Sequence, residues 1–213
     1  FQCEQTAKGT GCTVQGVCGK NPSVAYQQDY ITLALIDLAV RIKGQKRKAS
    51  TNRLILDGLF TCITNVSFDD EKCKEIAEAI YTEAATYNQT DEAINLVVNQ
   101  TQDIFLGDAN QVSLRSLLIF GLRGMGAYAY HAYVLNYRDE KMMDDIVRYL
   151  AACAEEHSVE EWLALLHDFG LSNYRTMELL DKANTESFGN PRPTAVTMKV
   201  EKGPFIVVSG HDY

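Results

Sequence analysis

The sequence lacks a long apolar run and lacks an excess of positive charge. No stretch approaches the roughly eighteen uncharged apolar residues that a membrane-spanning helix needs, and the start at Phe1-Gln2-Cys3 has neither the basic lead nor the apolar core of a secretory signal. The net charge is −8, from 20 basic and 28 acidic residues. Nucleic acids and anionic membranes attract basic surfaces. We therefore expect no nucleic-acid partner and no membrane association.

Cysteine is scarce along most of the chain. Three of the six cysteines, Cys3, Cys12 and Cys18, fall at the very start, and the other three are spread through helical patterns. A secreted disulfide scaffold is shorter and more evenly cross-linked. This distribution favours a reducing, cytoplasmic location, with the three scattered cysteines (Cys62, Cys73 and Cys153) acting as small buried residues.

Apolar residues recur at helical spacing over most of the remaining chain. Asn21-Pro22 is a typical helix start, and Ser158-Val159-Glu160-Glu161 is a capping box. The pattern predicts helices over 22–42, 52–65, 67–87, 91–104, 110–138, 142–150 and 158–183, the last with a pause at Gly170. Helices of this number with short links favour antiparallel bundles. We expect a mainly α fold of two three-helix bundles.

The character of the sequence changes after Gly189, where Pro191 and Pro193 end the helical pattern. Residues 194–199 alternate and 205–208 are a short apolar run, which predicts a short β segment. Such a run needs a partner strand, so it favours the first strand of a following domain. The expected division is a Cys-rich loop (1–20), a helical-bundle domain (21–190), and a linker with that first strand (191–213), within a longer protein.

The glycines at 121, 124 and 126 resemble a phosphate-binding loop only superficially. They lie inside a long helical pattern rather than between a strand and a helix, which is where such loops occur. We expect them to let a second helix pack closely, at some cost in helix propensity. Tyr128, Tyr130 and Tyr133 are expected to supply core and rim packing.

The N-terminal loop carries the pattern with chemical meaning. Cys3, Cys12 and Cys18 are spaced Cys-x8-Cys-x5-Cys among four glycines, which allow tight turns around a bound centre. Thiolates bind both zinc and iron–sulfur clusters, so this spacing leaves the two alternatives open, together with reduced cysteines that bind no metal. A cubane cluster needs four ligands, and a cysteine immediately before Phe1 would complete the set.

Several segments together resemble one family, the hybrid-cluster proteins (the prismane or hydroxylamine reductase family). They are 2–7, 11–13 and 16–20 at the start, 113–118 and 121–132 in the long helix, and 206–212 near the end. In that family the cysteine pattern is Cys-x2-Cys-x8-Cys-x5-Cys. The resemblance implies that Cys3, Cys12 and Cys18 are the second to fourth ligands of a [4Fe–4S] cluster, of the form found in anaerobes.

The resemblance also implies a function. His211 matches a histidine ligand of the family's second, hybrid iron–sulfur–oxygen cluster, whose other ligands come from later domains. The full-length parent is then expected to be an oxidoreductase that takes electrons from a donor protein and reduces hydroxylamine or nitric oxide. This part would hold the electron-transfer cluster and be inactive alone. The alternative is a non-catalytic helical module that binds a metal or an iron–sulfur cluster.

Overall fold

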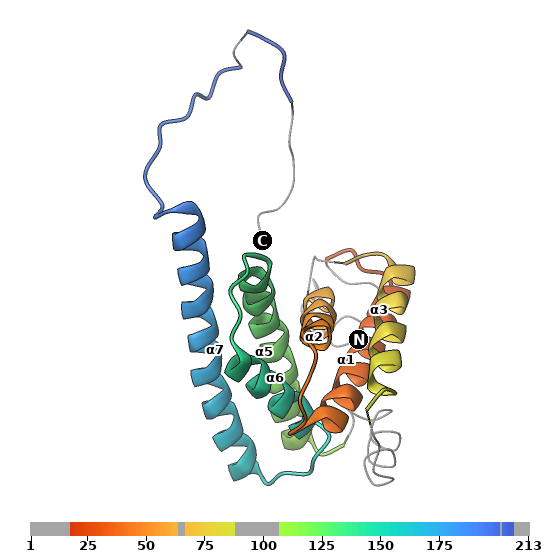
Figure 1. Cartoon of the computed structure of the whole chain (residues 1–213). Coiled ribbons are helices and arrows are strands. Elements are labelled where there is room, and N and C mark those ends of the chain that lie inside the picture. Colours follow the sequence, from red (N-terminus) through yellow and green to blue (C-terminus); the bar gives the residue numbers. More distant parts are fainter. Residues whose placement is uncertain (1–17, 64–66, 88–106, 201, 207–213) are drawn as a thin grey trace.

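The computed structural model describes residues 18–63, 67–87, 107–200 and 202–206. In those ranges the chain forms six α-helices, which confirms the mainly α fold (Figure 1). They are α1 (Pro22–Ile42), α2 (Ala49–Thr61), α3 (Asp70–Ala84), α5 (Ala109–Val134), α6 (Glu140–Ala152) and α7 (Val159–Phe188). The helix expected over 91–104 lies outside the described residues.

Short polar side chains fix where five of these helices begin. Asn21 accepts a hydrogen bond of 2.8 Å from the Val24 amide, with Pro22 at the first helical position. The capping box at α7 is confirmed, because Ser158 and Glu161 each accept from the other's backbone amide. The caps of the remaining three helices are Asp69, Asp108 and Asp139. These bonds satisfy N–H groups that have no partner within the helix.

The expected pause at Gly170 is wrong, because α7 runs unbroken for 30 residues. A glycine inside a helix costs about 1 kcal/mol relative to alanine. That cost is small beside the packing of a helix that buries Trp162 and Phe169. The helix ends instead at Gly189, whose φ of 82° lies in the left-handed region that glycine tolerates.

The helices form two sets of mutual neighbours. Helices α1, α2 and α3 contact one another pairwise, as do α5, α6 and α7, and the α2–α5 and α1–α6 contacts join the two sets. Figure 1 shows α7 at one edge of the molecule and α3 at the other. The finer expectation of two antiparallel three-helix bundles stays a prediction, since 88–106 lies outside the described residues.

Two of the three glycines in the long helix mark close helix approaches, as expected. A Cβ on Gly126 would lie 2.6 Å from Leu59 Cβ, so this glycine lets α5 approach α2. A Cβ on Gly121 would lie 2.6 Å from the Phe169 ring of α7. Gly124 differs, because its Cβ would meet nothing within 4 Å. Close packing thus explains Gly121 and Gly126 but not Gly124.

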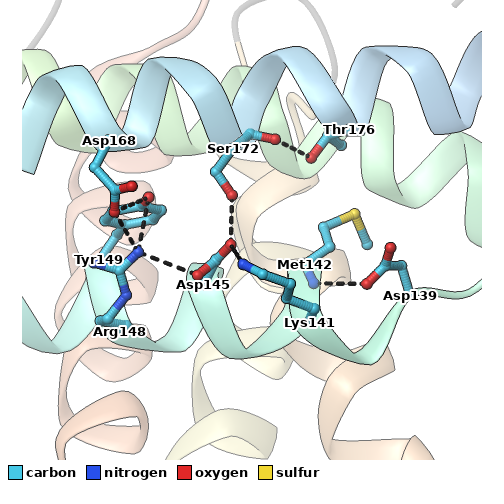
Figure 2. Close-up of polar contacts among 9 residues, drawn as sticks. All are labelled: Asp139, Lys141, Met142, Asp145, Arg148, Tyr149, Asp168, Ser172 and Thr176. Carbon is cyan, nitrogen blue, oxygen red and sulfur yellow. Dashed lines mark hydrogen bonds and ion pairs between the residues drawn. The ribbon is translucent and has the colours of Figure 1, made fainter.

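A polar network joins α6 to α7 (Figure 2). Asp145, only 8% exposed, accepts a hydrogen bond of 2.7 Å from Ser172 and forms ion pairs with Lys141 and Arg148 of its own helix. Arg148 also pairs with Asp168 of α7 at 2.6 Å. The network satisfies a buried carboxylate and fixes the rotation of α7 against α6.

The predicted β segment is not confirmed. Residues 191–200 and 202–206 contain no strand, and their apolar side chains are exposed, Val196 at 79% and Met198 at 99%. A strand is held by a ladder of hydrogen bonds to a partner, and no described residue provides one here. The rest of the predicted segment, 207–208, lies outside the described residues. Among the described helices, none combines the length and apolar character that crossing a membrane requires.

Candidate functional site

Of the four predicted ligands, the structure describes Cys18. Its side chain is half-buried in the turn that precedes α1. Cys3, Cys12 and His211 lie outside the described residues. Within the described ranges no three His, Cys, Asp or Glu side chains are grouped so that they could hold a metal ion. The predicted ligand set therefore stays a prediction. Among its members, the structure gives a position for Cys18 alone.

A buried lysine lies two residues after Cys18. The Lys20 side chain is only 7% exposed, and its Nζ donates a hydrogen bond of 2.7 Å to the carbonyl oxygen of Ile63, just beyond α2. The same ammonium lies 5.9 Å from the centre of the Phe68 ring. These contacts tie the segment that carries Cys18 to the end of α2 and to the start of α3.

The surroundings of Lys20 are rich in thiols. Burial lowers the Lys20 pKa, while the thiols of Cys18, Cys62 and Cys73 act in the opposite direction. The ammonium is therefore within electrostatic range of three sulfur atoms from three different parts of the chain.

A second cation, Arg123 of α5, completes this region. Its Nη2 donates a hydrogen bond of 2.8 Å to Thr32 Oγ1 of α1, and its guanidinium lies 5.5 Å from the Phe120 ring centre. Its charge lowers the pKa of Lys20 and opposes the burial that raises the pKa of Cys62. Arg123, Lys20 and Cys62 therefore share one electrostatic environment.

Hydrogen bonds between α1 and the end of α2 hold the residues around Lys20 and Arg123 together. Gln28 Nε2 donates to the Thr61 carbonyl at 2.8 Å, and the Cys62 thiol donates to the Gln28 carbonyl at 3.4 Å. Thr32 Oγ1 donates to the same Gln28 carbonyl at 2.9 Å and receives the bond from Arg123. Because these side chains hold one another, Arg123 is fixed in place.

The three scattered cysteines are buried, as expected. Burial raises the pKa of Cys62 and raises that of Cys153 to about 12, so both are neutral thiols at pH 7. Cys73 is also fully buried, 3.4 Å from the Ser67 hydroxyl. They pack as small apolar residues.

Sequence reasoning missed the two cations. Lys20 lies at the end of the N-terminal segment 16–20, yet nothing in its spacing indicates that its ammonium reaches the end of α2. Arg123 sits among helix-forming residues in a pattern that predicts a helix and no site. The only sequence signal was a single basic residue within an otherwise uncharged stretch of the long helix.

Comparisons with known proteins all point to one family. The model of the Prismane/CO dehydrogenase family matches residues 1–213. The proteins named hydroxylamine reductase from Thermoanaerobacter pseudethanolicus and Maridesulfovibrio salexigens are each 36% identical, over 239 and 231 residues. The one from Desulfitobacterium hafniense strain Y51 is 34% identical over 247 residues. These alignments cover 99–100% of this chain and 43–44% of the relatives, so the chain spans less than half of their length.

Proposed function

Because this chain belongs to the Prismane/CO dehydrogenase family, we propose that it is the electron-transfer part of an iron–sulfur oxidoreductase. In this proposal residues 1–20 form the cluster-binding loop, 21–190 the helical-bundle domain, and 191–213 a linker and the first strand of a following domain. The helices hold the loop in place for electron transfer to a second centre in the parent protein.

We assign the cluster to Cys3, Cys12 and Cys18, with a further cysteine before Phe1 as the fourth ligand of a [4Fe–4S] centre. The observation that carries this assignment is the position of Cys18, which is half-buried, two residues before Lys20 and within electrostatic range of its buried ammonium. Thiolate-bound clusters carry negative charge, and a neighbouring cation compensates that charge. The charge of Lys20 near Cys18 supports this assignment.

The bound cluster would supply one-electron transfer. The chain's own residues have simpler tasks. Cys18 supplies a thiolate, and Lys20 fixes the end of the loop to the Ile63 carbonyl. The hydrogen bond from Gln28 to the Thr61 carbonyl joins α1 to the end of α2. A fixed and partly dry environment keeps the reorganisation that accompanies electron transfer small.

The substrate proposal rests on the relatives, which carry the name hydroxylamine reductase. We propose that the full-length parent reduces hydroxylamine, or nitric oxide, with electrons from a donor protein. Reduction would occur at a hybrid iron–sulfur–oxygen cluster to which His211 contributes one ligand. The other ligands would come from later domains, so the 213-residue chain alone is expected to be inactive. The four described cysteines are all free thiols, which supports a reducing cytoplasm as the location.

The cluster is tested by analysis of iron, labile sulfide and zinc in anaerobically purified protein, together with absorbance at about 400 nm, where thiolate-bound iron absorbs. Cys18→Ser should lose most of the iron and sulfide. The matched control is Cys153→Ser, which alters a thiol buried in the helical core and should retain both. Bound zinc without iron or sulfide would refute the cluster assignment.

The catalytic half of the proposal needs a separate assay. Hydroxylamine reduction with a reduced dye as electron donor should proceed with the full-length parent and not with the 213-residue chain. Clear turnover by the chain alone would show that the later domains are not required.

A further inference from the structure

Helix α7 carries an exposed apolar face along most of its length. Positions that are seven, eleven, fourteen and twenty-five residues apart lie on one side of a helix, because each interval is close to a whole number of turns. In α7 these positions are Leu163, Gly170, Tyr174, Met177 and Phe188. The four apolar side chains of this set are between 45% and 76% exposed. We call this set the outer face of α7.

The opposite side of α7 is occupied by its neighbours in the fold. Trp162, Phe169 and Thr176 are buried there, and the Phe169 ring lies against Gly121 of α5 and Tyr149 of α6. Figure 1 shows α7 at the edge of the molecule, with α5 and α6 on one side of it. The outer face is therefore open to solvent in the described structure. An apolar face of this extent on a folded protein marks an interaction site.

A glycine lies within the outer face. A Cβ on Gly170 would meet nothing within 4 Å, so no contact in the described structure explains a residue that is unfavourable inside a helix. Gly121 and Gly126 of α5 show what such a residue does where a neighbour is present, since they admit side chains of α7 and α2. Gly170 therefore lies where a partner can approach the backbone of α7 most closely.

The length of the relatives indicates which partner covers this face. The chain aligns with 43–44% of them, so more than half of each relative lies outside the aligned part. The outer face extends to Phe188, the last residue of α7, and the segment that follows also exposes apolar side chains such as Val200 and Ile206. A domain tethered at this end of the helix has a far higher effective concentration at the face than a second copy in dilute solution. These observations favour the later part of the parent protein over a second copy.

We propose that the outer face of α7 is the surface on which the following domain of the parent protein docks, with its closest approach at Gly170. This inference rests on the following domain in the proposed function, whereas the iron–sulfur cluster has no part in it. Removal of the four apolar side chains from water favours docking. Because α7 is itself fixed by α5 and α6, docking on it gives the two parts of the protein one relative orientation.

The test is hydroxyl-radical footprinting of the full-length parent, in which mass spectrometry measures how fast each side chain is oxidised. Tyr174 and Tyr26 form a matched pair, because the two rings are 61% and 65% exposed in this structure and lie on different helices. Relative to the same protein unfolded in urea, we expect oxidation of Tyr174 to be slowed by about tenfold or more, since the core of an interface excludes water. Tyr26 should be oxidised nearly as fast as in the unfolded protein. Equal protection of the two tyrosines would overturn the proposal, as would protection of Tyr174 that disappears on dilution, which indicates a second copy.

A variant tests the contact itself. Tyr174→Glu places a charge on the outer face and should prevent docking, because a carboxylate is costly to bury without a partner. In the full-length parent this variant should therefore raise the oxidation rate of Met177, whereas the matched control Tyr26→Glu should leave that rate unchanged. The same Met177 rate in both variants would contradict docking on this face. A parent protein that contains no domain after residue 213 would instead refute that part of the proposed function.

Discussion

The Lys20 ammonium donates a hydrogen bond of 2.7 Å to the carbonyl oxygen of Ile63. This bond links the turn before α1, which carries Cys18, to the residue that follows the end of α2. A hydrogen bond from a charged donor contributes more than a neutral one. The position of Cys18 relative to the helices therefore depends on a residue that is not itself a ligand.

Lys20→Met removes the donor while keeping a side chain of similar length. The Ile63 carbonyl then loses its partner, and we expect the free energy of unfolding to fall by about 1–3 kcal/mol. Urea denaturation of the chain measures this. Lys74→Met is the control, because Lys74 is exposed on α3, and it should change stability by less than about 0.5 kcal/mol. Equal effects of the two variants would contradict the role given to the bond.

Gly126→Ala and Gly124→Ala form a matched pair on one helix. At Gly126 the new methyl group would lie 2.6 Å from Leu59 Cβ, so α2 and α5 must move apart, at a cost of about 1–3 kcal/mol. At Gly124 the methyl group meets nothing within 4 Å, so the higher helix propensity of alanine should add up to about 1 kcal/mol. Thermal unfolding of both variants measures the difference. The same sign of change in both would contradict the packing described.

Asp145 should make stability sensitive to acid. Burial alone acts to raise its pKa, but hydrogen bonds from Ser172, Lys141 and Arg148 outweigh burial and hold the pKa below its usual value. An acid with a lowered folded-state pKa stabilises the protein above its unfolded pKa of about 3.9, and this stabilisation is lost as pH falls through the folded-state value. Figure 2 shows the contacts of Asp145 with Ser172, Lys141 and Arg148.

Asp145→Asn should therefore lower stability at pH 7 and flatten the loss of stability below about pH 4. Unfolding in urea across pH 2–7 follows both effects. Asp181→Asn, at an exposed position on the outer part of α7, is the control and should follow the wild type. If stability still fell steeply in acid in Asp145→Asn, the acid sensitivity would arise from another group.

Asp29 has the opposite pH dependence. Burial raises its pKa to about 6, and the charge of Arg123 opposes that shift. An acid with a raised folded-state pKa stabilises the protein below its unfolded pKa, and this contribution is lost as pH rises through about 6. Asp29→Asn should remove the decline in stability between about pH 4 and pH 6 that the wild type shows. Parallel stability curves for the two proteins would contradict this.

The sequence by itself determined the mainly α fold, the helix starts at Asn21 and Ser158, and two close helix approaches. Caps such as Asn21 and Ser158 act on amides within one turn, and apolar spacing acts within one helix, so both are visible locally. The use of Gly121 and Gly126 was also predictable, because small residues in a helix indicate close approach. The pause at Gly170 was wrong, since packing over 30 residues outweighs one unfavourable propensity. The ligands expected at Cys3, Cys12 and His211 stay predictions.

Only the tertiary structure brought Lys20 and Arg123 into one region. Their side chains meet partners on α1 and at the end of α2, far from them in sequence, and no local pattern encodes such a meeting. Burial, which also depends on the tertiary structure, raises the pKa of Asp29 and shields the Arg123 Nε–H, which has no described partner. The spacing of the cysteines along the chain predicted a ligand-bearing loop. The charges around Cys18, in contrast, come together only because the helices pack against one another.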